Sequence, residues 1–222
     1  LSIRRQRQMC IRDRYSGAVE SLSEFAEAYK IPVVETIAGR ANMLATHPLN
    51  IGPIGVTGSN SANNIAEKAD VILAIGTRLQ DFTTGSWTAF AQDAKFVSIN
   101  AARFDAHKHL SLPVVADAKV AINSLHEALD GFQTAPDWTA NAQKERQAWD
   151  DYVALNVSLD NGPNSYAQII GVVNELCDPR DRIVTAAGGL PAEVNANWRT
   201  LNIGTVDIAV SYTHLTLPTN RE

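Results

Sequence analysis

Glycines stand where two of the expected helices begin, and free backbone amides at such places can hold a phosphate. The more specific signal is the run Gly188, Gly189, Leu190 and Pro191, which follows the strand-like segment 183–186. Two successive glycines let the backbone come close to an anionic group. Many strand-to-helix turns use glycine for geometry alone, so the run by itself identifies no particular ligand.

A second set of glycines, Gly52, Gly55 and Gly58, precedes a helix expected over 60–69. Their spacing is G-x-x-G-x-x-G and not the G-x-G-x-x-G of dinucleotide-binding turns. Two interpretations are open, a permissive turn between structural elements and a loop that contacts a nucleotide.

An arginine follows the clearest strand of the sequence, the apolar run 71–76. Ligands of open α/β sheets bind at the carboxyl ends of strands, where Gly76-Thr77-Arg78 lies, and an arginine there can clamp a phosphate. An interdomain salt bridge is the alternative for Arg78. A polar loop continues from it through Gln80, Asp81, Thr83 and Thr84.

The histidines and cysteines indicate neither a metal site nor a nucleophile. His107 and His109 are two residues apart, whereas zinc pairs on one helix face need a spacing of three or four, and no third ligand is evident. A surface turn is therefore expected there. Cys10 and Cys177 are too few for a disulfide framework, and Cys177 is interpreted as a packed thiol. A reducing, cytoplasmic setting is the default expectation.

Strand-like runs alternate with helical periods from Tyr15 to about Gly131, which predicts βαβ units in a Rossmann-like, doubly wound parallel sheet. Helices are expected after a cap at Ser16, over 60–69 and over 117–129, and strands at 33–34, 71–76, 96–100 and 113–116.

A second unit follows a linker at 131–136 and a long amphipathic helix at 137–156. Ser165 is expected to cap a helix that leads to one clear strand, at 183–186, and to a further helix through Trp198. The apolar residues of the capped helix are expected to face inward: Ile169, Val172, Val173 and Leu176. With one strand, this second sheet is expected to be truncated.

The composition excludes several partners. Of 222 residues, 45% are hydrophobic and 19% charged, the net charge is −5, and the pI is about 5.5. These values argue against nucleic acid or an anionic membrane as the main partner. No apolar run approaches the roughly 20 residues of a membrane span. Both ends, 1–14 with five arginines and 210–222, look foreign to the rest and resemble translated sequencing-adapter sequence, so they are expected to be non-native or disordered.

Three segments in order carry a family resemblance: GVTGSNSANNIAEKADVILAIGTRLQDFTTGSWTAF at 55–90, FVSINAARFDAHKHLSLPVVADAK at 96–119 and IVTAAGGLPAEVNANWR at 183–199. They resemble thiamine-diphosphate-dependent enzymes of the acetolactate-synthase type, and among these the hydrolases of 3D-(3,5/4)-trihydroxycyclohexane-1,2-dione. The resemblance implies a central domain at 15–135, a linker helix at 136–163 and the truncated start of a pyrophosphate-binding domain at 164–209.

The resemblance also implies thiamine diphosphate and magnesium as cofactors, with Gly188, Gly189, Leu190 and Pro191 touching the diphosphate through backbone amides. The activating glutamate and the magnesium-binding motif of the family would lie outside this chain, so no catalytic or metal residue is assigned. The implied full-length parent, a homodimer or homotetramer, opens the cyclic dione to 5-deoxyglucuronate in myo-inositol catabolism. The piece alone is expected to be inactive.

Two alternatives stay open. One is a flavin-containing acetohydroxyacid synthase-type enzyme, whose relatives use the central domain for flavin near positions that correspond to the Gly58 loop and Arg78. The other is a non-catalytic, nucleotide-binding Rossmann-like module.

Overall fold

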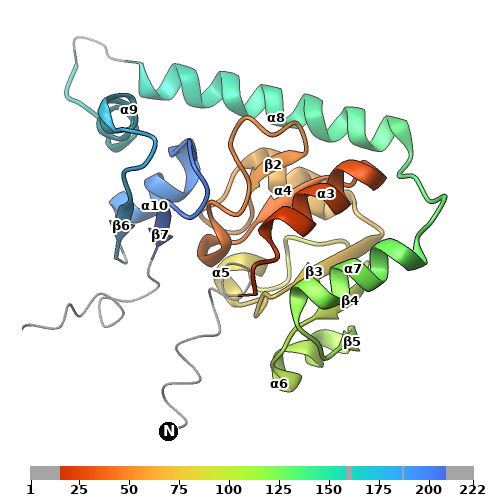
Figure 1. The fold of residues 1–222 in the computed structure, drawn as a ribbon. Helices are drawn as coiled ribbons and strands as arrows, with labels where there is room; N and C mark the ends of the chain where they lie inside the picture. Colours follow the sequence, from red (N-terminus) through yellow and green to blue (C-terminus); the bar gives the residue numbers. More distant parts are fainter. Residues whose placement is uncertain (1–15, 159–161, 187, 209–222) are drawn as a thin grey trace, which may run out of the picture.

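The computed structural model describes residues 16–158, 162–186 and 188–208 (Figure 1). The foreign-looking ends 1–14 and 210–222 lie outside the described residues. The elements, in chain order, are α3 (Val19–Tyr29), β1 (Val33–Glu35), η1 (Ile37–Gly39), β2 (Asn50–Pro53), α4 (Asn60–Lys68), β3 (Val71–Ile75), α5 (Asp81–Thr84), β4 (Lys95–Ile99), α6 (Arg103–Ala106), η2 (Lys108–Leu110), β5 (Leu112–Val114), α7 (Ala118–Ala128), α8 (Pro136–Val157), α9 (Tyr166–Leu176), β6 (Ile183–Thr185), α10 (Gly189–Asn197) and β7 (Val206–Ile208).

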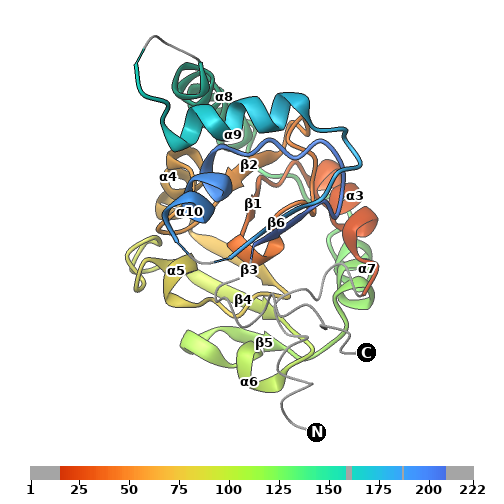
Figure 2. The same cartoon turned by 90° about the vertical axis from the view of Figure 1, so that its left-hand side faces the viewer.

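A parallel sheet of β3, β4 and β5, in that order, carries the first unit. Side chains of β3 point alternately to two clusters: Leu73 and Ile75 pack with α3 and α7, whereas Ile72 and Ala74 pack with α4. Figure 2 shows α3 and α7 on one side of the strands and α4 and α5 on the other. Helices on both faces of parallel strands confirm the expected Rossmann-like α/β class.

The start of α3 differs from the expectation that Ser16 caps it. The helix begins at Val19, its N-cap is Ala18, and this N-cap residue has no side-chain hydrogen bond to the helix. Gly17, with φ of 64°, turns the chain between Ser16 and the helix, which puts the serine too early to serve as the cap.

Strand β2 was not expected, because Asn, Gly and Pro are all depleted in strands. It pairs in parallel with β1, with a register shift after the first pair, and all four of its residues are buried. Side-chain hydrogen bonds stabilise the strand, one from α4 and one from a residue of the strand itself. Ser61 Oγ donates to the Ile51 carbonyl at 2.7 Å, and the Asn50 side chain accepts from the Gly52 amide at 3.0 Å.

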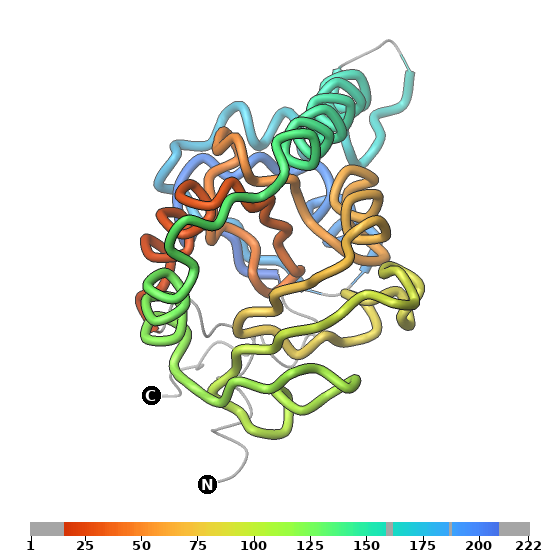
Figure 3. Tube along the Cα trace, turned by 90° about the vertical axis from the view of Figure 1, so that its right-hand side faces the viewer, coloured from red at the N-terminus to blue at the C-terminus, as the bar shows by residue number. Residues whose placement is uncertain are grey.

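Helix α8 runs along both units in Figure 1 and is seen almost end-on in Figure 3; it packs on α4, β2 and α9. Its buried face is narrow, with Thr139, Ala142 and Val153 buried. Polar bonds supply much of its attachment: Arg146 Nη1 donates to the Asn50 carbonyl at 2.9 Å, and Asn64 Nδ2 donates to Glu145 at 2.9 Å. Among the described helices, none combines the length and apolar character of a bilayer span.

The second unit has two strands where the sequence indicated one, because β7 pairs in parallel with β6. The predicted cap of α9 is confirmed: Ser165 and Gln168 form a reciprocal capping box.

The predicted inward face of α9 is wrong. Ile170 is buried in the core cluster, whereas Leu176 is 80% exposed and Ile169 and Val173 are also exposed. The face predicted to point inward has no layer over it among the described residues. The same cluster joins Ile170, Val194 and Trp198 to Ala41 of the first unit. The exact division of the chain into domains stays a prediction.

Candidate functional site

The turn from β6 to α10 holds all four residues predicted to touch a cofactor. Gly188 is the N-cap of α10, with φ of 142°, a conformation that favours glycine. Gly188, Gly189 and Leu190 are exposed and Pro191 is half-buried. Because Pro191 has no N–H, the donors at the tip of this helix are the amides of Gly189 and Leu190.

This turn leaves its backbone accessible at the start of α10. A Cβ placed on Gly189 would meet the Tyr166 ring at 3.6 Å, an ordinary contact, so packing within the chain does not demand glycine there. Without a side chain, the backbone stays open to solvent at the positive end of a helix of nine residues. The assignment of the four residues as cofactor contacts stays a prediction.

The turn from β2 to α4 has the opposite character. A Cβ on Gly55 would collide with the carbonyl of Phe82 and lie 2.9 Å from Thr83 Cα. The amides of this turn donate to acceptors of the chain itself: Gly55 N–H to Asn63 Oδ1 at 2.9 Å and Val56 N–H to the Phe82 carbonyl at 2.8 Å. These contacts support the interpretation of a packed turn between elements.

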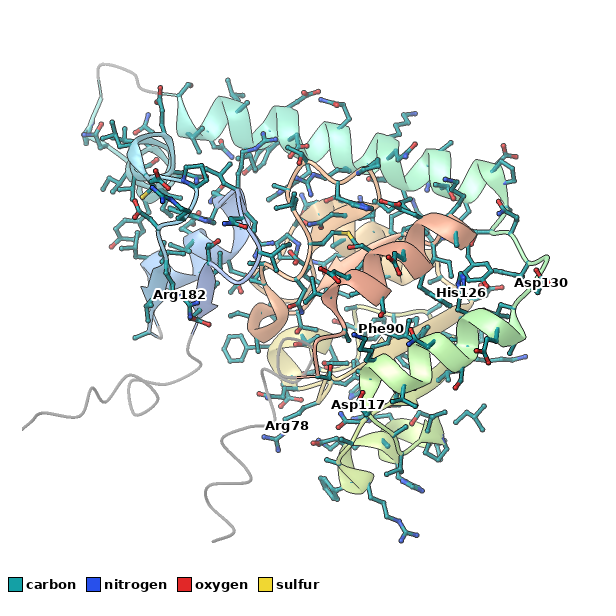
Figure 4. The ribbon with its side chains drawn as sticks, viewed as in Figure 1. Arg78, Phe90, Asp117, His126, Asp130 and Arg182 are labelled. Atoms are coloured by element: carbon teal, nitrogen blue, oxygen red, sulfur yellow. The ribbon has the colours of Figure 1, made fainter. Side chains whose placement is uncertain are left out.

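Arg78 lies at the carboxyl end of β3, as predicted, where it meets a buried carboxylate. Its Nε is 3.5 Å from Asp105 Oδ1, and Lys108 Nζ is 2.9 Å from the same oxygen. The Asp105 side chain is only 1% exposed. Arg78 therefore forms a salt bridge, as the alternative interpretation proposed. Its partner lies on α6 of the same unit, so the bridge is not an interdomain one. Figure 4 shows Arg78 on the side of the first unit that faces away from α8, whereas Arg182 lies beside β6.

The polar residues after Arg78 form the short helix α5. The amides of Thr83 and Thr84 both donate to the Gln80 carbonyl at 2.9 Å, and both threonines are buried. These bonds stabilise a turn of the backbone.

The two histidines lie on the surface, as predicted. His109 stacks on Trp87, with 3.6 Å between the ring centroids. Partial burial lowers the pKa of His109 below 6.5, the neighbouring Lys108 lowers it further, and Asp81 opposes the shift. Cys177 packs against the core cluster of the second unit, as a structural thiol does. The described part of the chain contains no group of three His, Cys, Asp or Glu side chains that could hold a metal.

One feature of the structure gave no signal in the sequence. Glu35 and Arg40 are both buried and form an ion pair, with 2.6 Å between Arg40 Nη1 and Glu35 Oε2. Arg40 Nη2 also donates to the Trp198 carbonyl at 2.8 Å, at the end of α10. A charged pair at the end of a short strand looks like any solvated turn in a sequence, so pattern alone did not reveal it.

Comparison with known proteins decides the family. Residues 12–125 match the family model described as "Thiamine pyrophosphate enzyme, central domain". The chain belongs to this family. The match covers the first unit from α3 into α7, and α10 lies beyond it.

Several curated relatives of this thiamine pyrophosphate enzyme chain are named as hydrolases of one compound. It is 34% identical over 225 residues to "3D-(3,5/4)-trihydroxycyclohexane-1,2-dione hydrolase 2" of Bacillus cereus (strain ZK), which covers 90% of this chain and 35% of the relative. It is 36% identical over 209 residues to the hydrolase of Geobacillus thermodenitrificans (strain NG80-2), covering 83% of this chain and 32% of that protein. The chain thus spans about a third of the length of these relatives.

Proposed function

We propose that this chain is the middle part of a thiamine-diphosphate-dependent hydrolase that opens 3D-(3,5/4)-trihydroxycyclohexane-1,2-dione. The parent would cleave a C–C bond of the ring and release 5-deoxyglucuronate, in myo-inositol catabolism. The observation that carries the proposal is the alignment with the Bacillus cereus hydrolase, which covers 90% of the chain, well beyond the 12–125 of the family model.

In this proposal the two units have different tasks. The first unit, with its closed turn and its buried ion pairs, is a scaffold. The second presents the amides of Gly189 and Leu190 to an oxygen of the diphosphate, where the α10 dipole also favours negative charge. Thiamine diphosphate, when bound, supplies the electron sink for cleavage of the C–C bond. Magnesium ligands would come from other parts of a homodimeric or homotetrameric parent.

A chimera tests the proposal. Residues 15–209 of this chain replace the aligned segment of the Bacillus cereus hydrolase, and ring opening of the dione is measured with thiamine diphosphate and magnesium. We expect turnover that depends on thiamine diphosphate. A matched chimera with the segment of the Geobacillus thermodenitrificans relative shows whether such grafts fold. If that control is active and the chimera is folded but inactive, the proposal is wrong.

The isolated chain gives a second test. With excess thiamine diphosphate and magnesium, the purified 222-residue chain is expected to show no dione hydrolysis. Measured turnover by this piece alone would overturn the assignment of the chemistry to other parts of the parent.

The contacts at the sheet edge argue against the flavin and nucleotide alternatives. The Gly55 turn donates its amides to the chain itself, and Arg78 faces the buried Asp105 carboxylate. Titration with flavin adenine dinucleotide and with ADP is expected to show no saturable binding. A bound yellow chromophore after purification would favour the synthase-type enzyme instead.

A further inference from the structure

Helix α10 is held by polar groups of the first unit at two points near its carboxyl end. Asn195 Nδ2 donates to the Thr57 carbonyl at 2.8 Å, and Arg40 Nη2 donates to the Trp198 carbonyl at 2.8 Å. The first bond is made by a side chain in the last part of α10 and the second by the carbonyl of its C-cap residue. The first unit thus holds α10 at its carboxyl end.

The Arg40 side chain is also held by Glu35, at the end of β1. Glu35 Oε2 accepts from Arg40 Nη1 at 2.6 Å, while Glu35 Oε1 accepts from the amides of Asn42 and Met43 at 2.9 and 3.0 Å. The planar guanidinium therefore joins the end of β1 to the end of α10 with two different nitrogens, a geometry that lysine cannot reproduce.

Two backbone hydrogen bonds between the segments that follow Arg40 and Trp198 add to this attachment. The Ala45 amide donates to the Thr200 carbonyl at 3.0 Å, and the Gly204 amide donates to the Ala41 carbonyl at 2.9 Å. Ala41 has φ of 65°, a left-handed conformation that is unfavourable for alanine. The surrounding contacts must hold the chain in that conformation.

We propose that Arg40 is a positioning residue, which sets where α10, and with it the Gly188–Pro191 turn, stands relative to the first unit. The inference rests on the proposed function of that turn. A helix of nine residues is about 13 Å long and stiff, so a shift at its carboxyl end moves the amides at its start. A buried ion pair adds little net stability when the cost of removing its charges from water is counted, so orientation of α10 is the role assigned to this pair.

Hydrogen exchange of the isolated chain tests the positioning without any cofactor. In Arg40→Lys the ammonium still neutralises Glu35, but the bond to Trp198 is lost, so we expect exchange in 189–198 to rise about tenfold, the size expected for one charged hydrogen bond. The amides of β3 and β4 should keep wild-type rates. Arg182→Met is the control, because it removes an exposed ion pair of the second unit, and it should change the exchange of α10 less than about twofold.

Two results would overturn the inference: wild-type exchange of α10 in Arg40→Lys, or an equal rise in α10 and β3, which would indicate a general loss of stability. Arg40→Met is less informative, because it leaves the Glu35 carboxylate buried and unpaired and so weakens the whole fold.

A second readout uses the chimera. If it is active, Arg40→Lys should raise the thiamine diphosphate concentration for half-maximal activity about tenfold and change kcat at saturation less than about twofold. A fall in kcat with unchanged cofactor dependence would contradict a positioning role. An inactive chimera would count against the proposed function, whereas the exchange result on Arg40 would stand by itself.

Discussion

Two glycine-containing turns lead into helices of this protein, and they do different things with their backbone. The turn at Gly55 packs against the backbone of Phe82, and its amides donate hydrogen bonds to acceptors within the chain. The turn at Gly188 and Gly189 is exposed and has room for a side chain at Gly189. A strand-to-helix turn can therefore contain glycine for two reasons. Either a neighbouring segment packs too closely for a side chain, or the backbone has to stay accessible to a ligand. Only the environment of the turn separates them.

The same contrast holds for the units that contain the turns. The first has a three-stranded parallel sheet with helices on both faces, and beside it the parallel pair β1–β2. The second has two strands and a helix, α9, with an exposed apolar side. Exposure of the strands themselves does not separate the two sheets, because Val71 of β3 and Leu112 of β5 are exposed as well as Val184 of β6.

The largest expected effect separates the two turns. Gly55→Ala forces a collision with backbone at a φ of 111°, so we expect a loss of about 4 kcal/mol in the free energy of unfolding. Gly189→Ala should leave that free energy unchanged or raise it by up to about 1 kcal/mol, because alanine favours a helix. Urea unfolding followed by tryptophan fluorescence measures both. Equal losses would show that the two turns do not differ.

The next effect compares the core of the first unit with the exposed side of α9. Ile122 of α7 is 1% exposed, so Ile122→Ala should lower the free energy of unfolding by about 3 kcal/mol. Ile169 of α9 is 43% exposed, so Ile169→Ala should lower it by less than about 1 kcal/mol. The same urea experiment applies. A large loss for Ile169→Ala would mean that a partner, such as a second copy of the chain, covers α9 in solution.

A smaller effect compares the helix caps. Asp117 Oδ1 accepts from the amides of Lys119 and Val120 at the start of α7, and Ser165 Oγ accepts from the Gln168 amide at the start of α9. Each alanine substitution should lower stability by about 1 kcal/mol. Hydrogen exchange should assign the change to α7 for Asp117→Ala and to α9 for Ser165→Ala. Exchange that rises in both helices for either variant would show that the units unfold together.

The smallest expected effect concerns His109. Its pKa lies below 6.5 because of partial burial beside Trp87, so the folded state takes up a proton less readily than the unfolded state. The contribution to stability is therefore complete above pH 6.5 and declines as the pH falls below it. NMR titration should give a midpoint below 6.5 for His109, and Trp87→Ala should move it upward. A midpoint that Trp87→Ala leaves unchanged would remove burial as the cause.

The sequence predicted best where one physical signal dominated. The apolar runs of β3 and β4, the cap at Ser165 and the βαβ alternation follow from hydrophobic period and side-chain chemistry, and all are present. Strand β2 was missed because its Asn, Gly and Pro oppose a strand locally and only neighbouring segments stabilise it. The prediction of which face of α9 is buried was wrong. The hydrophobic period shows which residues share a side of a helix, but it does not show whether another element covers that side.

The candidate site shows the same limit. Its position at a strand-to-helix turn could be predicted from Gly188 and Gly189, as could the place of Arg78 at the end of β3. The partners could not. Asp105 lies in a different segment from Arg78. Glu35 and Arg40 are close in sequence, but their burial and the bond from Arg40 to the Trp198 carbonyl arise only in the folded chain.

The most direct test of the account is an NMR titration of the isotope-labelled chain with thiamine diphosphate and magnesium. We predict saturable shifts of the Gly189 and Leu190 amides, with no change at Gly55, Val56 or Gly58. Shifts confined to the Gly55 turn or to Arg78 would contradict the account, because they would place the ligand on the unit assigned here as scaffold.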